Sequence, residues 1–311
     1  MPFNLKELAN RPERLASGHR MCAGCGGPIA VRSVLRALKP EDRAVISCAT
    51  GCLEVSTCMY PYTAWKDSFI HNAFENAGAT CSGVEAAFRA LKKRGKVNDE
   101  YKFIAFGGDG GTYDIGFQSL SGAMERGTDM VYVCYDNEAY MNTGIQRSSS
   151  TPRYADTTTT AIGSQSIGKP QYKKDMTKII AEHHIPYVAQ TTFIGNLKDL
   201  HNKAEKAIYT QGPAFLNIMA PCPRGWRYEA SDIMDVCKAA VETCVWPLYE
   251  VVNGEWLLSY EPKKKLPVED YLRLQGRFKH LFETGNESKI AEIQSNVDTR
   301  WKELLKLCSN V

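Results

Sequence analysis

The chain has 311 residues, enough to bury a substantial core, and is long for one domain outside the larger α/β folds. Its 38 basic and 35 acidic residues leave a net charge of +3, which argues against nucleic acid or an anionic membrane surface as a partner. The sequence has neither the ~18 consecutive apolar residues of a membrane helix nor an apolar signal segment near its start, so we expect a cytoplasmic protein.

Apolar runs alternate with helical patterns along most of the chain. The first part is predicted to contain an irregular arm (1–20), a cysteine turn (22–27), a helix (28–39), a strand (44–49), an aromatic loop (59–65) and a long helix (71–93). The second part is predicted to contain a strand (102–106), a helix (115–126), a strand (130–135), a polar loop (141–171), a helix (175–184), a strand (187–192), a helix (197–210) and a strand (214–219). This alternation predicts right-handed βαβ units and an α/β fold with a parallel sheet.

Beyond Trp226 the strand pattern fades into helical segments, which we interpret as a C-terminal helical arm packed on the domain or on a partner subunit. The sequence therefore predicts three parts: an N-terminal arm with the cysteine loop and its helix (1–40), an α/β domain (41–225) and the C-terminal arm (226–311). The polar loop at 141–171 is too long for an ordinary connection, and loops of this length are usually functional or disordered.

Four of the predicted strands lead into residues that can hold a metal. These residues are Cys52, Asp109 within the run Gly107-Gly108-Asp109-Gly110-Gly111, the pair Asp136-Asn137, and Cys222. In an open parallel sheet, ligands bind at the carboxyl ends of the strands. If these strands are neighbours, the sequence predicts a site for a charged, metal-dependent cofactor with a second metal centre beside it.

The turn Gly108-Asp109-Gly110 is followed, 28 residues after the aspartate, by Asn137. Mg²⁺ prefers about six oxygen ligands and commonly takes one or two carboxylates together with substrate phosphates. The glycines allow a diphosphate to approach the backbone, and the helix that follows points its N-terminus at it. A Gly-Asp-Gly turn alone is a weak signal, but the surrounding strands and Asn137 favour a cofactor site over a structural turn.

The chain has eleven cysteines, an odd number without the spacing of a secreted disulfide framework, so metal binding is the better explanation. The best set of thiolate ligands is Cys22, Cys25, Cys52 and Cys222. Cys48, within a strand, and Cys58, among aromatic residues, are alternatives for the third ligand. Zinc and an iron–sulfur cluster are equally compatible with such a set. The cysteines in apolar or helical surroundings are expected to pack as small hydrophobic residues: Cys81, Cys134, Cys237, Cys244 and Cys308.

Two longer segments resemble a known family. They are GGDGGTYDIG at 107–116 and YDNEAYMNTG at 135–144, and they are similar to the β subunit of pyruvate:ferredoxin oxidoreductase and related 2-oxoacid oxidoreductases. Those enzymes bind thiamine diphosphate. The segments Pro61–Trp65, His71–Asn76 and Gln275–Lys279 extend the resemblance nearly from end to end.

The resemblance implies a thiamine diphosphate-binding fold of the diphosphate-binding type at 41–225. Mg²⁺ would be bound by the side chains of Asp109 and Asn137 and by the carbonyl of Ala139, and Asn142 would be the catalytic residue that contacts substrate. The implied cofactor contacts are Thr50, Gly51, Gly108, Asp109, Gly110, Gly111, Asn137, Ala139, Asn142, Thr143 and Gly144. The resemblance also favours a [4Fe–4S] cluster over zinc at the four cysteines, because oxidation at thiamine needs a nearby electron acceptor.

The resemblance implies that partner subunits complete the enzyme. The chain has no Cys-x₂-Cys-x₂-Cys-x₃-Cys run, so the ferredoxin-like clusters would belong to an α-, γ- or δ-type subunit. The glutamate that activates thiamine would come from a partner's pyrimidine-binding domain, because Glu54, Glu75 and Glu138 are interpreted as ordinary hydrogen-bonding or surface groups. His71 is interpreted as a satisfied polar residue at a helix start rather than an acid–base group.

The activity implied is oxidative decarboxylation of a 2-oxoacid, with electrons passed to ferredoxin and with coenzyme A as the usual acyl acceptor. Pyruvate is the first choice of substrate, and oxalate, 2-oxoisovalerate, indolepyruvate and 2-oxoglutarate are alternatives. Two other hypotheses remain. One is a non-oxidative thiamine-dependent decarboxylase or synthase with structural zinc, and the other is a non-catalytic electron-transfer or scaffolding subunit that binds a cluster but no thiamine. The presence of both Asp109 and Asn137 argues against the second.

Overall fold

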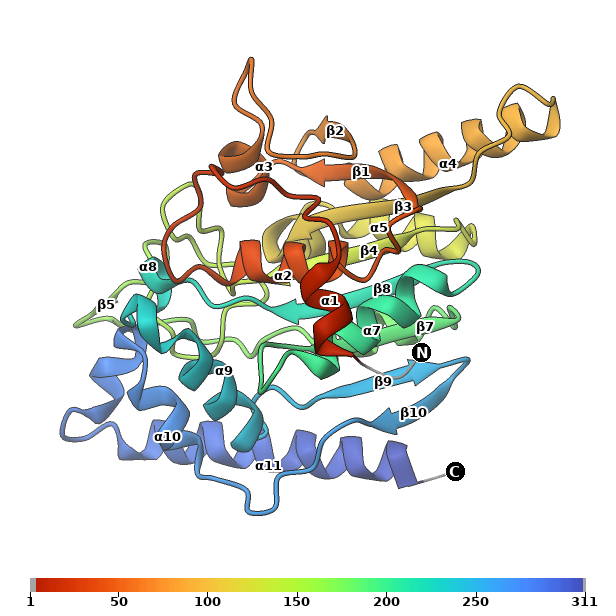
Figure 1. The fold of residues 1–311 in the computed structure, drawn as a ribbon. Coiled ribbons are helices and arrows are strands. Elements are labelled where there is room, and N and C mark those ends of the chain that lie inside the picture. Colours follow the sequence, from red (N-terminus) through yellow and green to blue (C-terminus); the bar gives the residue numbers. More distant parts are fainter. Residues whose placement is uncertain (1–3, 310–311) are drawn as a thin grey trace.

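The computed structural model describes residues 4–309, which form an α/β fold around one eight-stranded sheet (Figure 1). The strands of this sheet are β1 (Arg43–Ala49), β2 (Ser68–Asn72), β3 (Tyr101–Gly108), β4 (Val131–Asp136), β7 (Tyr187–Thr191), β8 (Ala214–Met219), β9 (Tyr249–Val252) and β10 (Glu255–Leu258). Their order across the sheet is β10-β9-β7-β8-β4-β3-β1-β2. All neighbours from β7 to β2 are parallel, and β9 and β10 add an antiparallel hairpin at one edge.

Helices surround the sheet. The α-helices are α1 (Leu5–Asn10), α2 (Gly26–Leu35), α3 (Cys52–Thr57), α4 (Ala77–Lys93), α5 (Phe117–Glu125), α6 (Met176–Ala181), α7 (Lys198–Tyr209), α8 (Pro223–Trp226), α9 (Ile233–Glu242), α10 (Val268–Arg273) and α11 (Glu287–Ser309). Three shorter turns are the π-helix η1 (Gly110–Asp114) and the 3₁₀-helices η2 (Ala230–Asp232) and η3 (Gly276–Phe282), and a small hairpin pairs β5 (Ile162–Gly163) with β6 (Ser166–Ile167).

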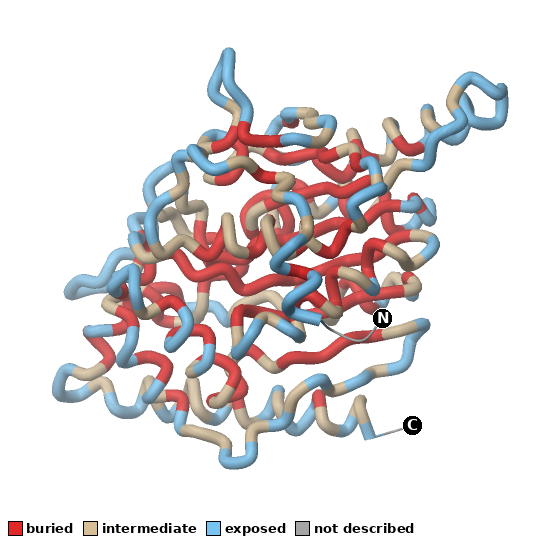
Figure 2. The backbone as a smooth tube through the Cα atoms, viewed as in Figure 1, coloured by how far each residue is buried: buried red, intermediate tan, exposed pale blue. Residues whose placement is uncertain are grey.

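The central strands are buried on both faces, which explains why they are almost continuously apolar. Side chains of β4 alternate between two cores: Val131 and Val133 pack with α2 and α7, whereas Tyr132 and Cys134 pack with α4 and α5. Figure 2 shows the result as a buried band through the middle of the molecule. The predicted parallel α/β fold is therefore confirmed.

Three expectations differ from the structure. The arm at 1–20 contains α1, and the region beyond Trp226 contains the strands β9 and β10 besides its helices. Helix α3 lies between the predicted strand at 44–49 and the predicted aromatic loop at 59–65, where no element was predicted. His71 lies in strand β2 and not at a helix start, because the Phe69-Ile70 segment pairs with β1 and the helix begins only at Ala77. These elements are short or lie at the sheet edges, where polar and apolar residues mix.

The polar loop at 141–171 is joined to the sheet by the hydrogen bonds of Ser148 to Asp109 and of Ser150 to Asp136, and β5 and β6 are the regular elements within that range. No helix between residues 4 and 309 combines the length and the apolar character needed to cross a membrane. The division of the chain at residues 40 and 225 stays a prediction, although β9 and β10 attach part of the C-terminal region to the main sheet.

Candidate functional site

The candidate site is a pocket of about 110 Å³, partly open to solvent, at the carboxyl ends of the central strands. Strands β8, β4, β3 and β1 are consecutive in the sheet, so the predicted metal-binding residues do share one rim. The pocket is lined by Thr50, Gly51, Cys52, Phe74, Gly108, Asp109, Gly110, Tyr135, Asn137, Ala139, Tyr140, Met141, Asn142 and Thr143. Phe74, Tyr140 and Met141 give it an apolar wall. From the sequence Tyr140 is expected to pack in the core or against a cofactor, whereas Phe74 and Met141 are not assigned to a cofactor.

Two predicted contacts do not line the pocket. Gly111 is buried inside the π-helix η1, and Gly144 lies in an exposed turn where its carbonyl accepts a hydrogen bond from Thr158. Gly110 does line the pocket, and the structure shows why this position requires glycine. A Cβ atom at this position would lie 2.3 Å from the ring of Tyr140, so only glycine lets that ring close over the turn.

The Asn137 amide, Asp109 Oδ1 and the carbonyl oxygen of Ala139 converge in the pocket. One atom of the Asn137 amide lies 2.9 Å from Asp109 Oδ1 and 2.8 Å from the carbonyl oxygen of Ala139. Without a cation this atom is best assigned as the nitrogen, which donates hydrogen bonds to both; with a cation bound, the amide would turn its oxygen inward and present three oxygens. The arrangement with three oxygens fits Mg²⁺, because adjacent ligands of an octahedral ion with bonds of 2.0–2.1 Å lie roughly 2.9 Å apart.

The electrostatics of Asp109 favour a cation at this position. Burial and the neighbouring carboxylate of Asp136 raise the pKa of Asp109 well above its usual range. Its Oδ2 atom accepts a hydrogen bond of 2.5 Å from the Ser148 hydroxyl, which leaves Oδ1 free to face Asn137 and Ala139. A divalent ion beside Oδ1 would neutralise this buried charge.

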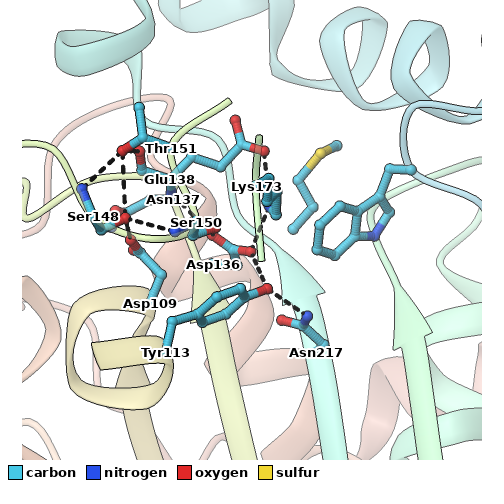
Figure 3. A network of polar contacts seen from close by, with 12 residues as sticks. Asp109, Tyr113, Asp136, Asn137, Glu138, Ser148, Ser150, Thr151, Lys173 and Asn217 are labelled. Carbon is cyan, nitrogen blue, oxygen red and sulfur yellow. Dashed lines mark hydrogen bonds and ion pairs between the residues drawn. The ribbon is translucent and has the colours of Figure 1, made fainter. Parts of the chain in front are cut away.

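A serine- and threonine-rich segment, 148–151, closes over the acids behind the pocket (Figure 3). The Ser150 hydroxyl donates to Asp136 Oδ1 at 2.6 Å, and the Thr151 hydroxyl donates to the carbonyl of Glu138 at 2.6 Å. Sequence reasoning missed these residues. The signal for them was the polar character of the 141–171 loop, which indicated function but not which side chains carry it.

The four selected cysteines gather next to the pocket from three segments. Cys52 begins α3 and lines the pocket, and Cys222 caps the first turn of α8 at the end of β8. The Gly26 amide donates to the Pro221 carbonyl at 2.9 Å, which joins the N-terminal turn to the end of β8. Burial, with a further contribution from the thiols of Cys222, Cys52 and Cys22, raises the pKa of Cys25 to about 12.

The alternatives Cys48 and Cys58 have other surroundings. Cys48 is fully buried within β1, and the Cys58 thiol donates to Glu54 Oε1 at 2.8 Å. The same carboxylate oxygen lies 2.8 Å from His71 Nδ1. Cys58, Glu54 and His71 thus form a polar trio at α3, in which Cys58 donates to Glu54 and His71 lies within ion-pair distance of it, so His71 has a polar partner as expected.

The chain is similar to known proteins over most of its length. A profile of the thiamine pyrophosphate enzyme, C-terminal TPP binding domain, matches residues 49–218, more than half of the chain. Pyruvate synthase subunit PorB of Thermotoga maritima is 49% identical over 99% of this chain and 97% of its own length. PorB of Methanocaldococcus jannaschii is 51% identical over 94% of this chain and 96% of its own length.

Two further relatives are more distant. Ketoisovalerate oxidoreductase subunit VorB of Pyrococcus furiosus is 41% identical over 99% of this chain and 98% of its own length. The solved 2-oxoglutarate:ferredoxin oxidoreductase of Magnetococcus marinus shares the fold with a TM-score of 0.57, at 21% identity over 94% of this chain and 96% of the solved one. The chain therefore belongs to the thiamine pyrophosphate-dependent oxidoreductases and, among them, to the family of the pyruvate synthase PorB subunits.

Proposed function

We propose that this chain is the β subunit of a pyruvate:ferredoxin oxidoreductase, holding thiamine diphosphate, Mg²⁺ and a [4Fe–4S] cluster. The observation that carries the proposal is the adjacency of two sites. Three converging polar groups, of Asp109, Asn137 and Ala139, form one side of a pocket whose lining also includes Cys52. A cofactor anchored at these groups would have its electron acceptor directly beside it.

When bound, thiamine diphosphate supplies the nucleophilic carbon and the electron sink for cleaving a 2-oxoacid, and the cluster accepts the electrons. The role of the chain's own residues would be to bind the cofactor and to orient it toward the substrate. Asp109, Asn137 and Ala139 would hold Mg²⁺ and with it the diphosphate. Thr50 and Gly51 would lie at the thiazolium end of the cofactor, and Asn142 and Thr143, at the exposed rim, would face the reacting carbon and the substrate.

The choice of a cluster over zinc rests on the proposed redox role, because oxidation at thiamine needs a nearby electron acceptor and zinc has no redox chemistry. Among the described residues, no three of the four sulfurs of Cys22, Cys25, Cys52 and Cys222 lie within 4.8 Å of one another, so they are not arranged as a closed zinc site.

Partners complete the proposed enzyme. Asp109 is the only carboxylic acid among the described residues that line the pocket, and it belongs to the proposed metal site. The glutamate that activates thiamine would therefore come from a partner subunit's pyrimidine-binding domain. Further clusters on a partner would carry electrons to ferredoxin.

Pyruvate is the proposed substrate because the PorB relatives share 45–51% identity with this chain, against 41% for the ketoisovalerate subunit. Oxalate is the alternative that differs most in chemistry, because its oxidation yields only carbon dioxide and electrons and needs no coenzyme A. Activity with pyruvate should therefore require coenzyme A, whereas activity with oxalate should not.

The test is an anaerobic optical spectrum of the purified complex, recorded before and after adding one 2-oxoacid at a time, with and without coenzyme A. We expect broad absorbance at ~400 nm that bleaches when pyruvate is added. With coenzyme A also present, the complex should turn pyruvate over. Bleaching by oxalate without coenzyme A would reassign the substrate. A colourless complex that contains zinc would overturn the oxidoreductase and leave a thiamine-dependent lyase.

A further inference from the structure

Glu138 lies between two of the three converging polar groups, in a backbone conformation that glutamate rarely adopts. Its φ is +65°, in the left-handed region. This turn follows β4, and in it the Asn137 side chain lies 2.9 Å from Asp109 Oδ1 and 2.8 Å from the Ala139 carbonyl oxygen. The sequence interpretation treated Glu138 as an ordinary hydrogen-bonding or surface group, yet its side chain is only 2% exposed.

Every polar group of Glu138 has a hydrogen-bond partner, and Figure 3 includes the contact with Lys173. Its amide donates to Asp136 Oδ1 at 3.0 Å, and its carbonyl accepts from Thr151 at 2.6 Å. One carboxylate oxygen accepts from Lys173 Nζ at 2.9 Å, and the other accepts from Arg277 Nη2 at 2.5 Å. The side chain is thus clamped between two cations, and the backbone conformation is fixed from both sides.

Arg277 ties this turn to the C-terminal region, because it lies 139 residues further along the chain, in η3. Its guanidinium group lies 3.9 Å from the ring centre of Trp226 and donates through Nε to Gln275. The indole nitrogen of Trp226 donates in turn to the carbonyl of Asn137 at 2.7 Å. Arg277 and Trp226 therefore hold two successive residues of the metal-binding turn.

We propose that Glu138 is a positioning residue whose carboxylate, clamped by Lys173 and Arg277, fixes the 137–139 turn so that Asn137 and Ala139 meet the cation at Asp109. The inference rests on the proposed Mg²⁺ site. It makes the C-terminal region part of the cofactor site although that region does not line the pocket. Groups behind metal ligands typically change metal affinity 10- to 100-fold when they are removed.

The alternative explanation is that the Glu138 ion pairs only stabilise the fold. Two substitutions separate the alternatives. Glu138→Gln keeps the shape of the side chain but weakens the clamp. Glu138→Gly accepts a positive φ without strain but has no side chain to be clamped, so it tests whether the backbone conformation alone is sufficient.

The measurement is Mn²⁺ binding, as a probe of the Mg²⁺ site, to the intact multi-subunit complex. The complex is freed of divalent ions, supplied with thiamine diphosphate and titrated with Mn²⁺ while free Mn²⁺ is followed by electron paramagnetic resonance. We expect Glu138→Gln, Glu138→Gly and Arg277→Met each to raise the apparent Mn²⁺ dissociation constant 10- to 100-fold. Binding as tight as in the unsubstituted complex for Glu138→Gln or Glu138→Gly would overturn the inference.

Two controls separate positioning from stability. Glu250→Gln changes another buried carboxylate, which lies on strand β9 and bonds to Tyr187 at 2.6 Å and to Lys206 at 2.5 Å, and it should leave Mn²⁺ binding unchanged. The double variant Glu138→Gln with Arg277→Met leaves no arginine without a carboxylate partner, so it should recover thermal stability and still bind Mn²⁺ weakly. Recovery of tight binding in the double variant would contradict the clamp. An unsubstituted complex without thiamine-dependent Mn²⁺ binding would overturn the proposed function itself, an outcome distinct from the others.

Discussion

The hydroxyl of Tyr113 sits at the centre of the polar network behind the pocket. It donates to Asp136 Oδ2 at 2.7 Å and accepts from the Asn217 amide at 2.8 Å, and all three side chains are buried. Tyr113→Phe would remove two buried hydrogen bonds: the one that Asn217 donates to the hydroxyl and the one that the hydroxyl donates to Asp136. We expect it to lower the free energy of unfolding by about 1–3 kcal/mol, measured by chemical denaturation. Tyr132→Phe is the matched control, because that hydroxyl meets only Thr112, at 3.2 Å, and its loss should cost less.

The charge of Asp109 gives a second prediction at the residue scale. Asp109→Asn preserves the shape of the side chain and its contact with Ser148 but removes the negative charge at the three converging polar groups. We expect retention of thiamine diphosphate in the presence of Mg²⁺ to fall at least ~10-fold after gel filtration. Asp114→Asn is the control, because Asp114 bonds to Tyr140 and the Ser149 amide and lies outside the pocket lining. Equal retention in Asp109→Asn and the unsubstituted complex would refute the metal site.

Sequence reasoning located Asp109 and Asn137 on one rim, because each directly follows an apolar run and parallel strands end together. It could not find the residues behind them. Ser148 lies 39 residues from Asp109, and Arg277 lies 139 residues from Glu138, without a motif that links either pair. Only the folded chain brings such partners together. The residues that hold the metal ligands in place are therefore harder to predict from sequence than the ligands themselves.

At the scale of elements, the sequence predicted best where burial is complete. All residues of β4 and β8 are buried, and both were predicted to within about two residues as apolar runs. Strands β2 and β10 were missed because their side chains are mostly half-buried or exposed, so polar residues interrupt the pattern. Edge strands depend on the neighbour they pair with, which the local sequence does not specify.

Helix α4 offers a test of local propensity. Gly83 lies exposed in the middle of this 17-residue helix, and a Cβ atom there would meet no atom within 4 Å. Gly83→Ala should therefore raise the free energy of unfolding by about 0.5–1 kcal/mol, seen as a higher melting temperature. The opposite is expected for Gly116→Ala, whose Cβ would lie 2.0 Å from the carbonyl oxygen of Gly111. A melting temperature unchanged or lowered by Gly83→Ala would contradict the prediction.

At the scale of the whole molecule, the C-terminal region completes the sheet. Strand β9 pairs with β7, and the long helix α11 contributes Val297 and Leu304 to the two apolar cores. Removing residues 247–311 would leave β7 as an unpaired hydrophobic edge, so we expect insoluble protein even when the partner subunits are co-expressed. Removing residues 1–10 should leave the chain soluble, because Leu8 is the only buried side chain of α1. If the chain without residues 247–311 were soluble and had an unchanged melting temperature, the C-terminal region would instead be a separate arm.

The positions of the four cysteines have a consequence for how the protein is made. Cys22, Cys25 and Cys52 leave the ribosome early, whereas Cys222 follows about 200 residues after the first. If the four hold one cluster, iron closes a loop of that length, and a cross-link over a long loop removes much of the freedom of the unfolded chain. Completion of the cluster would then wait for most of the chain to be translated, and iron supply would limit how many newly made chains reach the native state.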